Sequence, residues 1–477
     1  MVRLATAAQI EEHRDEFQSL LSQVEENSTS SGSQSRELHP NASAHVFARV
    51  RPVLPHETAG RHFKTVFAGH DGEMKVHMLS TTLKGFPRLA PSEFKVDRSF
   101  GASAQNADIY QVVCRPLVDL AKKGGSATLF AYGQTGSGKT YTVAGLVELA
   151  AGDLFVDAQG LEIGVSVVEI LGSDIRELMG EDVGAPVQLL EDQFGRVQLR
   201  GCVSQVARNS DELKACISQA VELRRTEATE KNDTSSRSHM IIRISIRNVN
   251  LVEADEGLLC LVDLAGSESA KDTSHHSTDR LKETKLINTS LMTLKDCMRN
   301  RSAVFQTKGR IHIPYRASKL TLAMRDCFEL AVRRPIKAAI IACVSPLEMD
   351  GPHSVNTLRY AAGIRVAPKQ IVMEADKKDP MNWDRDTVLR FLNKAGGGLV
   401  IVDDLIPEGS GKTLVEIPEH EFMSRVLKAG TMSDKQAKEL YLKLWKLVVD
   451  ARSRFRFKQK NVTAAPPEQE EDKMEEC

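Results

Sequence analysis

The eight residues Gly133–Thr140 constrain this chain more than any other segment. They read Gly-Gln-Thr-Gly-Ser-Gly-Lys-Thr, which matches the phosphate-loop pattern G-x-x-x-x-G-K-[ST]. The apolar run Thr128–Ala131 precedes them, and a helical pattern over Lys139–Leu149 follows. A strand, a glycine-rich turn and a helix N-terminus in this order predict a loop whose main-chain N–H groups surround a polyphosphate.

Two side chains of this loop have the chemistry that such a ligand requires. Lys139 would bring a mobile positive charge to the β- and γ-phosphates, and the Thr140 hydroxyl would hold Mg²⁺. The string Gly409–Thr413 imitates the motif, but Ile406 stands where its first glycine should be. We therefore expect only a polar loop there.

Two other segments fit a phosphate site. Asp263-Leu264-Ala265-Gly266 follows the apolar run Leu258–Val262, so its carboxylate would stand at the end of a strand and could hold a Mg²⁺-bound water. Gly266 has no Cβ, and its N–H can therefore approach a γ-phosphate. The segment Asn232–His239 offers hydroxyls and an arginine before another strand, although alone it would be an ordinary polar turn.

Between about Ala44 and Val366 the chain alternates β-branched apolar runs with longer helical patterns. This order predicts an α/β fold with a central sheet covered on both faces. The clearest predicted strands are His45–Val50, Ala127–Ala131, Ile241–Ile246 and Leu258–Leu264, and the clearest helices are Asp108–Lys122, Lys139–Leu149 and Asp211–Lys231.

The flanking sequence divides into smaller units. Residues 1–43 form an N-terminal extension whose helix candidate has Ile10, Phe17 and Val24 seven residues apart. Two heptads are too few for a stable free coiled coil. Docking or disorder is therefore favoured over dimerisation, which stays the alternative. Residues 367–382 would be a linker, 383–453 a small all-α module with helices over Arg385–Asn393, Glu419–Ala429 and Ser433–Arg452, and 454–477 a charged disordered tail.

Charge and composition narrow the function. The 477 residues carry 63 Lys+Arg and 64 Asp+Glu, which excludes a globally basic nucleic-acid binder. Lys282–Lys337 nevertheless holds thirteen basic and four acidic residues, an excess of nine that a solvated helical face or an anionic partner would explain. No aromatic platform or major-groove helix accompanies it, so we expect no nucleic-acid partner.

Membrane and metal-cluster classes are not indicated either. The most apolar stretch, Ala338–Val344, is far shorter than the roughly 20 residues that span a bilayer, so no membrane contact is expected. The eight cysteines are scattered without a C-x-x-C pair or zinc-ligand spacing.

Taken together and in order, the motifs resemble the kinesin motor domain over about residues 44–366. The matching strings are Arg49–Pro52, Phe130–Tyr132, Asn232–His239, Asp263–Glu268, Ile287–Leu291, His312–Thr321 and Asn356–Ala361. The resemblance implies a P-loop NTPase fold with a central, mostly parallel sheet and helices on both faces. It also implies an ATP-hydrolysing motor that uses Mg²⁺ and binds microtubules.

The resemblance also implies roles for individual residues. Ser235 and Ser236 would close over the γ-phosphate, Gly266 would meet it, and Arg237 would pair with Glu268 when the site closes. Mg²⁺ would be held by Thr140, Ser236 and Asp263. The nucleotide would be bound by Arg49, Arg51, Pro52, Gln134, Thr135, Gly136, Ser137, Gly138, Lys139, Thr140 and Tyr141. ATP is preferred over GTP, because the nearest Asn-Lys-x-Asp string, Asn393–Gly396, has glycine in place of the acid.

The track-binding face and the subclass follow from the same resemblance. Tubulin would be contacted by Lys75, Lys285, Lys295, Cys297, Arg299, Lys308, Arg316 and Lys319. The string Leu294–Arg299 is similar to that of the internal-motor, microtubule-depolymerising kinesin-thirteen class. Two departures stand against it: Lys75-Val76-His77 aligns with a Lys-Val-Asp expected at a hairpin tip, and Thr289 replaces the usual lysine.

Several functional alternatives remain open. An end-acting depolymerase is favoured, while a translocating kinesin dimerised or arrayed by a partner and a tether without turnover are the others. The C-terminal module, from Trp383 to about Arg452, resembles a sterile-alpha-motif domain in Trp383, Val388 and Phe391-Leu392, but a plain helical bundle fits too. It could bind a protein partner. The expected location is the cytoplasm and the microtubule cytoskeleton, with the spindle or cilium as candidate sites.

Overall fold

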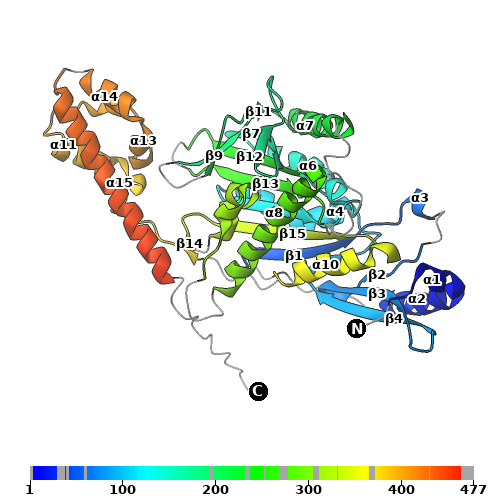
Figure 1. Cartoon of the computed structure of the whole chain (residues 1–477). Coiled ribbons are helices and arrows are strands. Elements are labelled where there is room, and N and C mark those ends of the chain that lie inside the picture. The colour runs from blue at the N-terminus through cyan, green and yellow to red at the C-terminus, as the bar shows by residue number, and fades with distance from the viewer. Residues whose placement is uncertain are drawn as a thin grey trace.

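The computed structural model describes residues 4–29, 38, 42–58, 62–192, 197–230, 237–251, 254–267, 278–304, 311–329, 331–364, 371–428 and 430–462. They form an α/β body and a smaller group of helices beside it (Figure 1). Among these residues, no helix combines the length and the apolar composition that a bilayer crossing requires.

Nine of the described strands form one sheet at the centre of the α/β body, in the order β11-β7-β12-β13-β6-β15-β1-β5, with β8 on β7. Its strands are β1 (Ala44–Val50), β5 (Arg98–Phe100), β6 (Ser126–Tyr132), β7 (Leu161–Leu171), β8 (Asp174–Glu177), β11 (Gln205–Ala207), β12 (His239–Asn248), β13 (Gly257–Asp263) and β15 (Ile336–Val344). From β13 to β5 all neighbours are parallel, whereas β12 and β7 join antiparallel. The α/β fold and its central sheet are thus confirmed.

Two hydrophobic cores lie on the two faces of this sheet. Successive strand residues alternate between them, as in β1, where Phe47 belongs to one core and Val46 to the other. The first core is covered by α4 (Asn106–Ile109), α5 (Arg115–Lys122), α6 (Lys139–Phe155) and α7 (Ser210–Glu230); α4 and α5 are joined by a π-helical turn, Tyr110–Cys114. The second is covered by α8 (Thr278–Ala303), α9 (Lys319–Ala323) and α10 (Gly351–Ala362).

The carboxyl ends of the parallel strands meet at one edge. Here β6 ends at Tyr132 and β13 ends at Asp263, which lies opposite Ala131. Because β12 runs antiparallel, its amino end reaches the same edge, with Met240 opposite Asp263. The phosphate-loop segment, the Asp263 segment and the residues before β12 are therefore brought together by sheet topology, as expected for an open α/β sheet.

A small three-stranded sheet carries the N-terminal extension. It consists of β2 (Val66–Ala68), β3 (Glu73–Thr81) and β4 (Pro87–Lys95), and α3 (Pro55–Thr58) precedes it. Two helices, α1 (Ala7–Glu12) and α2 (Arg14–Thr29), dock onto it: Phe17 is fully buried and stacks edge-on against Phe63, with ring centroids 6.5 Å apart. The two helices are thus docked on this sheet, while dimerisation stays a prediction.

Within the described residues, five α-helices form the C-terminal group around a core of their own, which includes the fully buried Leu392 and Phe422. They are α11 (Arg385–Ala395), α12 (Val402–Leu405), α13 (Gly411–Glu416), α14 (Glu419–Leu427) and α15 (Asp434–Val462). We predicted a disordered tail from residue 454, and this is wrong for its first part, because α15 continues to Val462. We expected only a polar loop at Gly409–Thr413. Instead α13 begins within this string, and the Ser410 side chain caps the helix.

The connection between the two bodies lies on the α/β body. The strand β16 (Ile371–Val372) pairs in parallel with β14 (Ala331–Val332). Beyond it, Arg333 pairs with Asp379 at 3.1 Å, and Arg454 of α15 pairs with Asp376 at 2.8 Å. Another short two-stranded sheet, β9 (Gln188–Glu191) with β10 (Val197–Arg200), lies elsewhere on the α/β body, next to α9.

Truncating the core of the C-terminal group tests whether it is an independent unit. Phe422→Ala is expected to lower the free energy of unfolding of this unit by about 3–5 kcal/mol, because a fully buried ring leaves a cavity. Thermal unfolding followed by calorimetry should show one transition moved down and the transition of the α/β body unmoved. Ile401→Ala, at a half-exposed position of the same unit, is the matched control. A joint shift of both transitions would contradict an independent unit.

Candidate active site

The phosphate-loop segment joins β6 to α6 through glycines with left-handed backbone. Gly133, Gly136 and Gly138 have φ of 154°, 77° and 92°. A Cβ on Gly133 would lie 2.2 Å from the carbonyl oxygen of Cys343 on the neighbouring strand, so no other residue fits there without a shift of the backbone. Gly136 has open space around it, which leaves the main chain of the loop accessible.

The polar side chains of the loop bind its own main chain and the neighbouring strand. The Lys139 ammonium and the Ser137 hydroxyl both donate to the carbonyl oxygen of Gln134, at 2.9 and 2.7 Å. The Thr140 hydroxyl donates to the Asp263 carboxylate at 2.8 Å. The loop and the acid at the end of β13, both expected at the phosphate site, are therefore in direct contact.

Asp263 is buried, with 2% of its surface exposed, and its charge is compensated by Arg224 of α7. One guanidinium nitrogen of Arg224 donates to Asp263 Oδ2 at 3.1 Å, and another donates to the carbonyl oxygen of Ser238 at 2.8 Å. The Ser238 hydroxyl donates to Glu169, which also faces Arg224 at 3.4 Å. The buried Arg224 thus links β13, β7 and the residue before β12, and through Asp263 it also reaches Thr140 after the loop.

The second oxygen of Asp263, Oδ1, is buried and has no hydrogen-bond partner among the residues that the structure describes. A buried carboxylate oxygen that lacks a donor is costly, and this one lies on a side chain bonded to the Thr140 hydroxyl. A threonine hydroxyl and a carboxylate at a phosphate loop are suitable oxygen ligands for Mg²⁺ and its waters. The residues present therefore fit a Mg²⁺–nucleotide complex.

Arg49 and Tyr141 form the side of the site expected to face the base. The Arg49 guanidinium lies over the Tyr141 ring at 5.3 Å and donates to Asn106 and Thr142 at 2.7 and 2.8 Å. Burial lowers the pKa of Arg49 from its usual value. The ring of Tyr141 is 64% exposed, so its free face is open to a ligand.

Arg51 and Pro52, also expected to bind the nucleotide, follow β1. The Arg51 guanidinium is engaged in a bidentate ion pair with Glu57, at 2.5 and 2.7 Å, and lowers the pKa of that carboxyl. Pro52 is exposed, and its carbonyl oxygen accepts from Arg51 at 2.9 Å. Arg51 thus fastens the segment after β1 through its side chain.

His239, the first residue of β12, connects the site to α8. Its Nδ1 accepts from the main-chain N–H of Ala265 at 3.0 Å, which leaves the proton on Nε2 to be donated to Ser290 of α8 at 2.8 Å. Complete burial, with further contributions from Arg224 and Lys139, lowers the pKa of His239 from 6.5 to about 3. The neutral ring is therefore the folded form at neutral pH.

The helix α8 presents only part of the predicted tubulin-binding set. Lys285 and Arg299 are exposed, and Lys295 lies 5.8 Å above the Tyr360 ring. Cys297 is fully buried in the core beneath the sheet, so its assignment to a partner-binding face is wrong. One helical turn around Cys297 necessarily points some residues inward, and Leu294 and Met298 share that inner face.

Lys75 was expected at a hairpin tip, and this is also wrong. Lys75, Val76 and His77 lie in the middle of β3, and Val76 is fully buried. The tip of the β3–β4 hairpin is formed by residues 82–86, where Leu83 is fully exposed. The string Lys95-Val96-Asp97 has the Lys-Val-Asp sequence itself, but it does not lie at the tip either, because Asp97 accepts from the main-chain N–H of Val46 at 2.7 Å.

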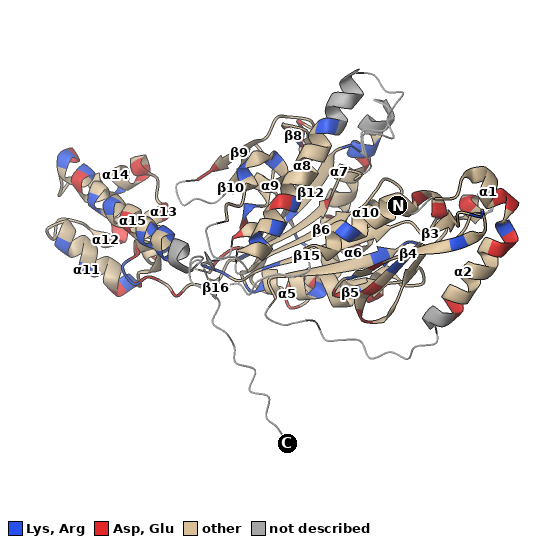
Figure 2. Cartoon of the chain, turned by 60° about the horizontal axis from the view of Figure 1, so that its bottom comes forward, with Lys and Arg blue, Asp and Glu red and all other residues tan. Residues whose placement is uncertain are grey.

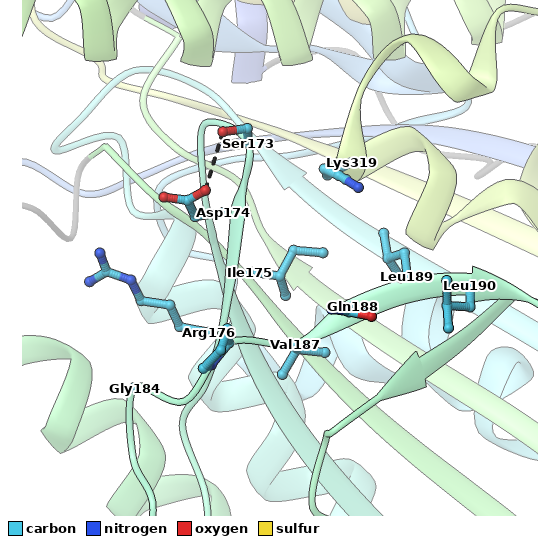
Figure 3. Close-up of a pocket in the computed structure, with 11 residues that line it drawn as sticks. Ser173, Asp174, Ile175, Arg176, Gly184, Val187, Gln188, Leu189, Leu190 and Lys319 are labelled. Atoms are coloured by element: carbon cyan, nitrogen blue, oxygen red, sulfur yellow. Dashed lines mark hydrogen bonds between the residues drawn. The ribbon is translucent and has the colours of Figure 1, made fainter.

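Lys319 lies beside a hollow of about 450 Å³ between β8, β9 and α9 (Figure 3), and Arg316 precedes it by three residues. Ile175, Val187 and Leu189 line it, and Lys319 stands at its rim. Arg316 is fixed by an ion pair to Glu191 of β9 at 2.6 Å. Both basic residues are exposed, as a partner-binding role requires.

Four predicted site residues lie outside the described part of the chain: Ser235, Ser236, Glu268 and Lys308. Arg237 and Gly266 are described, and Gly266 follows β13 in the buried segment that ends at the site. Arg224 and Glu169 were not predicted, since a charged residue within a helix or strand has no sequence signal that distinguishes it from a solvated one.

Comparisons with known proteins agree on one family. The model of the kinesin motor domain matches residues 49–366. A relative described as diatom spindle kinesin-1, from Cylindrotheca fusiformis, is 36% identical over 333 residues, which is 68% of this chain and 51% of the relative. The kinesin-like protein KIN-13B of Arabidopsis thaliana is 33% identical over 355 residues, 71% of this chain and 49% of that protein. The chain thus spans about half the length of these two relatives.

Solved structures are similar as well. A fast kinesin superposes with a TM-score of 0.60 at 27% identity, covering 71% of this chain and 99% of that one. The C-terminal motor and motor homology domain of Kar3Vik1, fused to a synthetic coiled coil, gives a TM-score of 0.57 at 26% identity, covering 68% and 85%.

The buried histidine makes stability depend on pH. Because the folded pKa of His239 is about 3, below the ordinary 6.5, the unfolded chain binds more protons between these values, and stability is lost as pH falls through this window. Between pH 7 and pH 5 this single group would contribute a loss of about 2 kcal/mol. Chemical denaturation of His239→Gln at both pH values should show a correspondingly smaller loss. His312→Gln, at an exposed position, should behave as the parent chain does; an unchanged pH dependence in His239→Gln would contradict the assignment.

Proposed function

The chain belongs to the kinesin family, and on this premise we propose that it hydrolyses ATP with Mg²⁺ and that microtubules or tubulin stimulate this activity. The single observation that carries the proposal is the contact between the Thr140 hydroxyl and the buried Asp263 carboxylate, whose other oxygen has no donor within the described part of the chain. It joins the two segments that a Mg²⁺–nucleotide complex must bridge. The proposed location is the microtubule cytoskeleton; one relative is named for the spindle.

The proposed roles of Lys139 and Mg²⁺ follow from where negative charge develops during phosphoryl transfer. Phosphoryl transfer is largely a matter of positioning and of stabilising charge on the transferred group. Lys139 is the first residue of α6, where the unpaired main-chain N–H groups of a helix N-terminus favour anions, and it would neutralise the β- and γ-phosphates of the bound nucleotide. The Mg²⁺ ion would supply charge neutralisation when bound, held through Thr140, Ser236 and Asp263.

The proposed closing step involves residues after the sheet edge. Ser235 and Ser236 would cover the γ-phosphate, and Arg237 would pair with Glu268 around the attacking water. The Gly266 N–H would meet the γ-phosphate oxygen. Because Arg224 already compensates the charge of Asp263, a bound Mg²⁺ would be a second cation beside this carboxylate.

Coupling to the track would run through His239. Its ring touches the main chain of Ala265, between Asp263 and Gly266, and the Ser290 side chain of α8. A shift of the segment after β13 would therefore move one of the two hydrogen-bond partners of this ring relative to the other. The helix α8 carries Lys285, Lys295 and Arg299, which we assign to tubulin together with Arg316 and Lys319.

Two substitutions separate nucleotide binding from turnover. Lys139→Ala is expected to weaken nucleotide binding by about 100-fold or more, because a charge that faces phosphate in the ground state is lost. Glu268→Ala is expected to leave binding within a few-fold and to lower kcat by about 10²–10³, because its partner is met only in the closed state. Fluorescent-nucleotide titration and steady-state ATPase assays measure the two quantities. Equal loss of affinity in both variants would contradict these roles.

A background rate in the same ATPase assay, with microtubules and with free tubulin, would overturn the enzymatic proposal. Cosedimentation with microtubules that ignores the nucleotide would then favour a tether. Such a tether would use the kinesin fold only to attach the C-terminal helical group, for which we propose a protein partner.

For the mode of action we propose microtubule depolymerisation from the ends. Support comes from the string Leu294–Arg299 and from the similarity to KIN-13B, a kinesin-like protein by name. The buried Cys297 and the mid-strand position of Lys75 reduce the face available for it, and leave Lys285, Lys295 and Arg299 of α8 to contact tubulin. The alternative is a translocating kinesin that a partner dimerises or arrays.

Imaging decides between these modes. Stabilised microtubules incubated with the protein and ATP are expected to shorten from their ends, without gliding when the same preparation is attached to a surface. Omission of ATP and the Glu268→Ala variant are the controls, and both should preserve length. Robust gliding at constant length would make the chain a translocating kinesin.

A further inference from the structure

The helix α8 has a buried cation, Arg301, in its last turn, and only 1% of the surface of this residue is exposed. The other described charged side chains of α8 are at least partly exposed: Lys285, Lys295, Asp296 and Arg299. Figure 2 shows the charged residues along this helix in blue and red. The helix dipole favours a cation at this end, but it does not replace a counter-ion.

The Arg301 guanidinium uses only part of its hydrogen-bonding capacity. Its Nη2 donates to the hydroxyl oxygen of Ser43, the residue before β1, at 2.5 Å. The other two nitrogens, Nε and Nη1, are buried and have no hydrogen-bond partner in the part of the chain that the structure describes. Buried donors without an acceptor are costly, and more so on a charged group. The geometry therefore leaves two nitrogens of a buried cation available to a ligand.

Two other buried arginines of this chain show how such a charge is normally compensated. Arg51 pairs with the carboxylate of Glu57 at 2.5 Å, and Arg224 pairs with that of Asp263 at 3.1 Å. For Arg301 the described residues supply no carboxylate, because its one hydrogen bond goes to a neutral hydroxyl. A buried charge without a counter-charge is among the least favourable arrangements in a protein core.

The charge of Arg301 is not removed by a change of protonation. Burial lowers the pKa of Arg301 to about 10, so the guanidinium still carries its proton at neutral pH. Among the described ionisable groups, the thiol of Cys327 acts electrostatically on it. Burial raises the pKa of this thiol to about 12, so Cys327 is neutral and supplies no negative charge. The compensating charge must come from outside the described residues.

The surroundings of Arg301 restrict the ligand to a small one. Because the guanidinium is buried between α8 and the start of β1, an organic anion or a phosphate would not reach it without opening the core. In the row of the sheet next to Ser43, Ala44 of β1 pairs with Ala338 of β15, and both belong to the core that α8 covers. These small side chains occupy little of the space between the sheet and the helix.

We propose that the Arg301 guanidinium binds one chloride ion, buried between the carboxyl end of α8 and the start of β1. The ion would accept hydrogen bonds from guanidinium nitrogens that have no partner among the described residues, and it would compensate the charge inside the core. A water molecule is the competing occupant; it would accept the same hydrogen bonds but leave the charge uncompensated. The site lies outside the nucleotide site and does not depend on the proposed function.

The test is thermal unfolding of the full-length chain in about 0.2 M sodium chloride and in sodium gluconate of the same ionic strength, so that general screening is equal. Chloride should raise the Tm of the α/β body by about 1–3 °C over gluconate, because the ion binds only the folded chain. Arg301→Met keeps the length of the side chain without its charge and should lose this difference. The matched control, Arg225→Met at an exposed position of α7, should keep it.

A second measurement does not depend on the folding of a variant. Crystals of the parent chain soaked in sodium bromide should show an anomalous difference peak beside the guanidinium of Arg301 and the hydroxyl of Ser43. A bromide peak without the chloride-dependent rise in Tm would mean binding at crystal concentration only, and would overturn the proposal. Equal chloride effects in the parent and in Arg301→Met, or no effect in the parent, would overturn it too and leave water as the occupant. The ATPase activity enters none of these outcomes.

Discussion

The arrangement of this protein depends on how the charge of Asp263 is kept in a buried place. An ionised carboxylate away from water is tolerated only with donors around it, and here the donors come from two different helices: Thr140 from α6 and Arg224 from α7. Arg224 in turn holds Ser238 and Glu169. The end of β13 therefore fixes the phosphate loop, β7 and the start of β12 relative to one another.

Much of the α/β body could be predicted because its sequence signals are local. The phosphate loop requires glycines where the structure has left-handed backbone, and the apolar runs of β1, β6, β12 and β13 are the strands expected of a buried parallel sheet. Thr140, at the start of α6, and Asp263, at the carboxyl end of β13, were both expected at the site from their motifs, and the structure brings their side chains into contact. Their roles toward Mg²⁺ stay a prediction.

The parts that could not be predicted depend on which way a residue faces. Cys297 lies in a string with Lys295 and Arg299, but the helix turns it into the core, where burial also raises the pKa of its thiol to about 12. Lys75 aligns with a tip residue in sequence, yet the register of β3 with β4 places it in mid-strand. Arg224 is one arginine among many until α7 docks. The helical continuation of α15 past residue 454 was missed because charge density suggested a solvated tail, whereas Phe455 packs under Arg333.

The link between the two bodies has a mechanical meaning. A load carried by the C-terminal helices reaches the large sheet through β16, which pairs with β14 over only two residues, through the ion pairs of Asp376 and Asp379, and through Lys412 of α13, which donates to the carbonyl oxygen of Ala254 at 2.9 Å. Only the Asp379 carboxylate is buried in these contacts, and the partly exposed pair of Asp376 with Arg454 is weak and weakens further with salt. Pulling on the C-terminal helices would therefore open this junction before it deforms the nine-stranded sheet. Under tension this junction would extend before the sheet does, and it would extend more easily at high ionic strength.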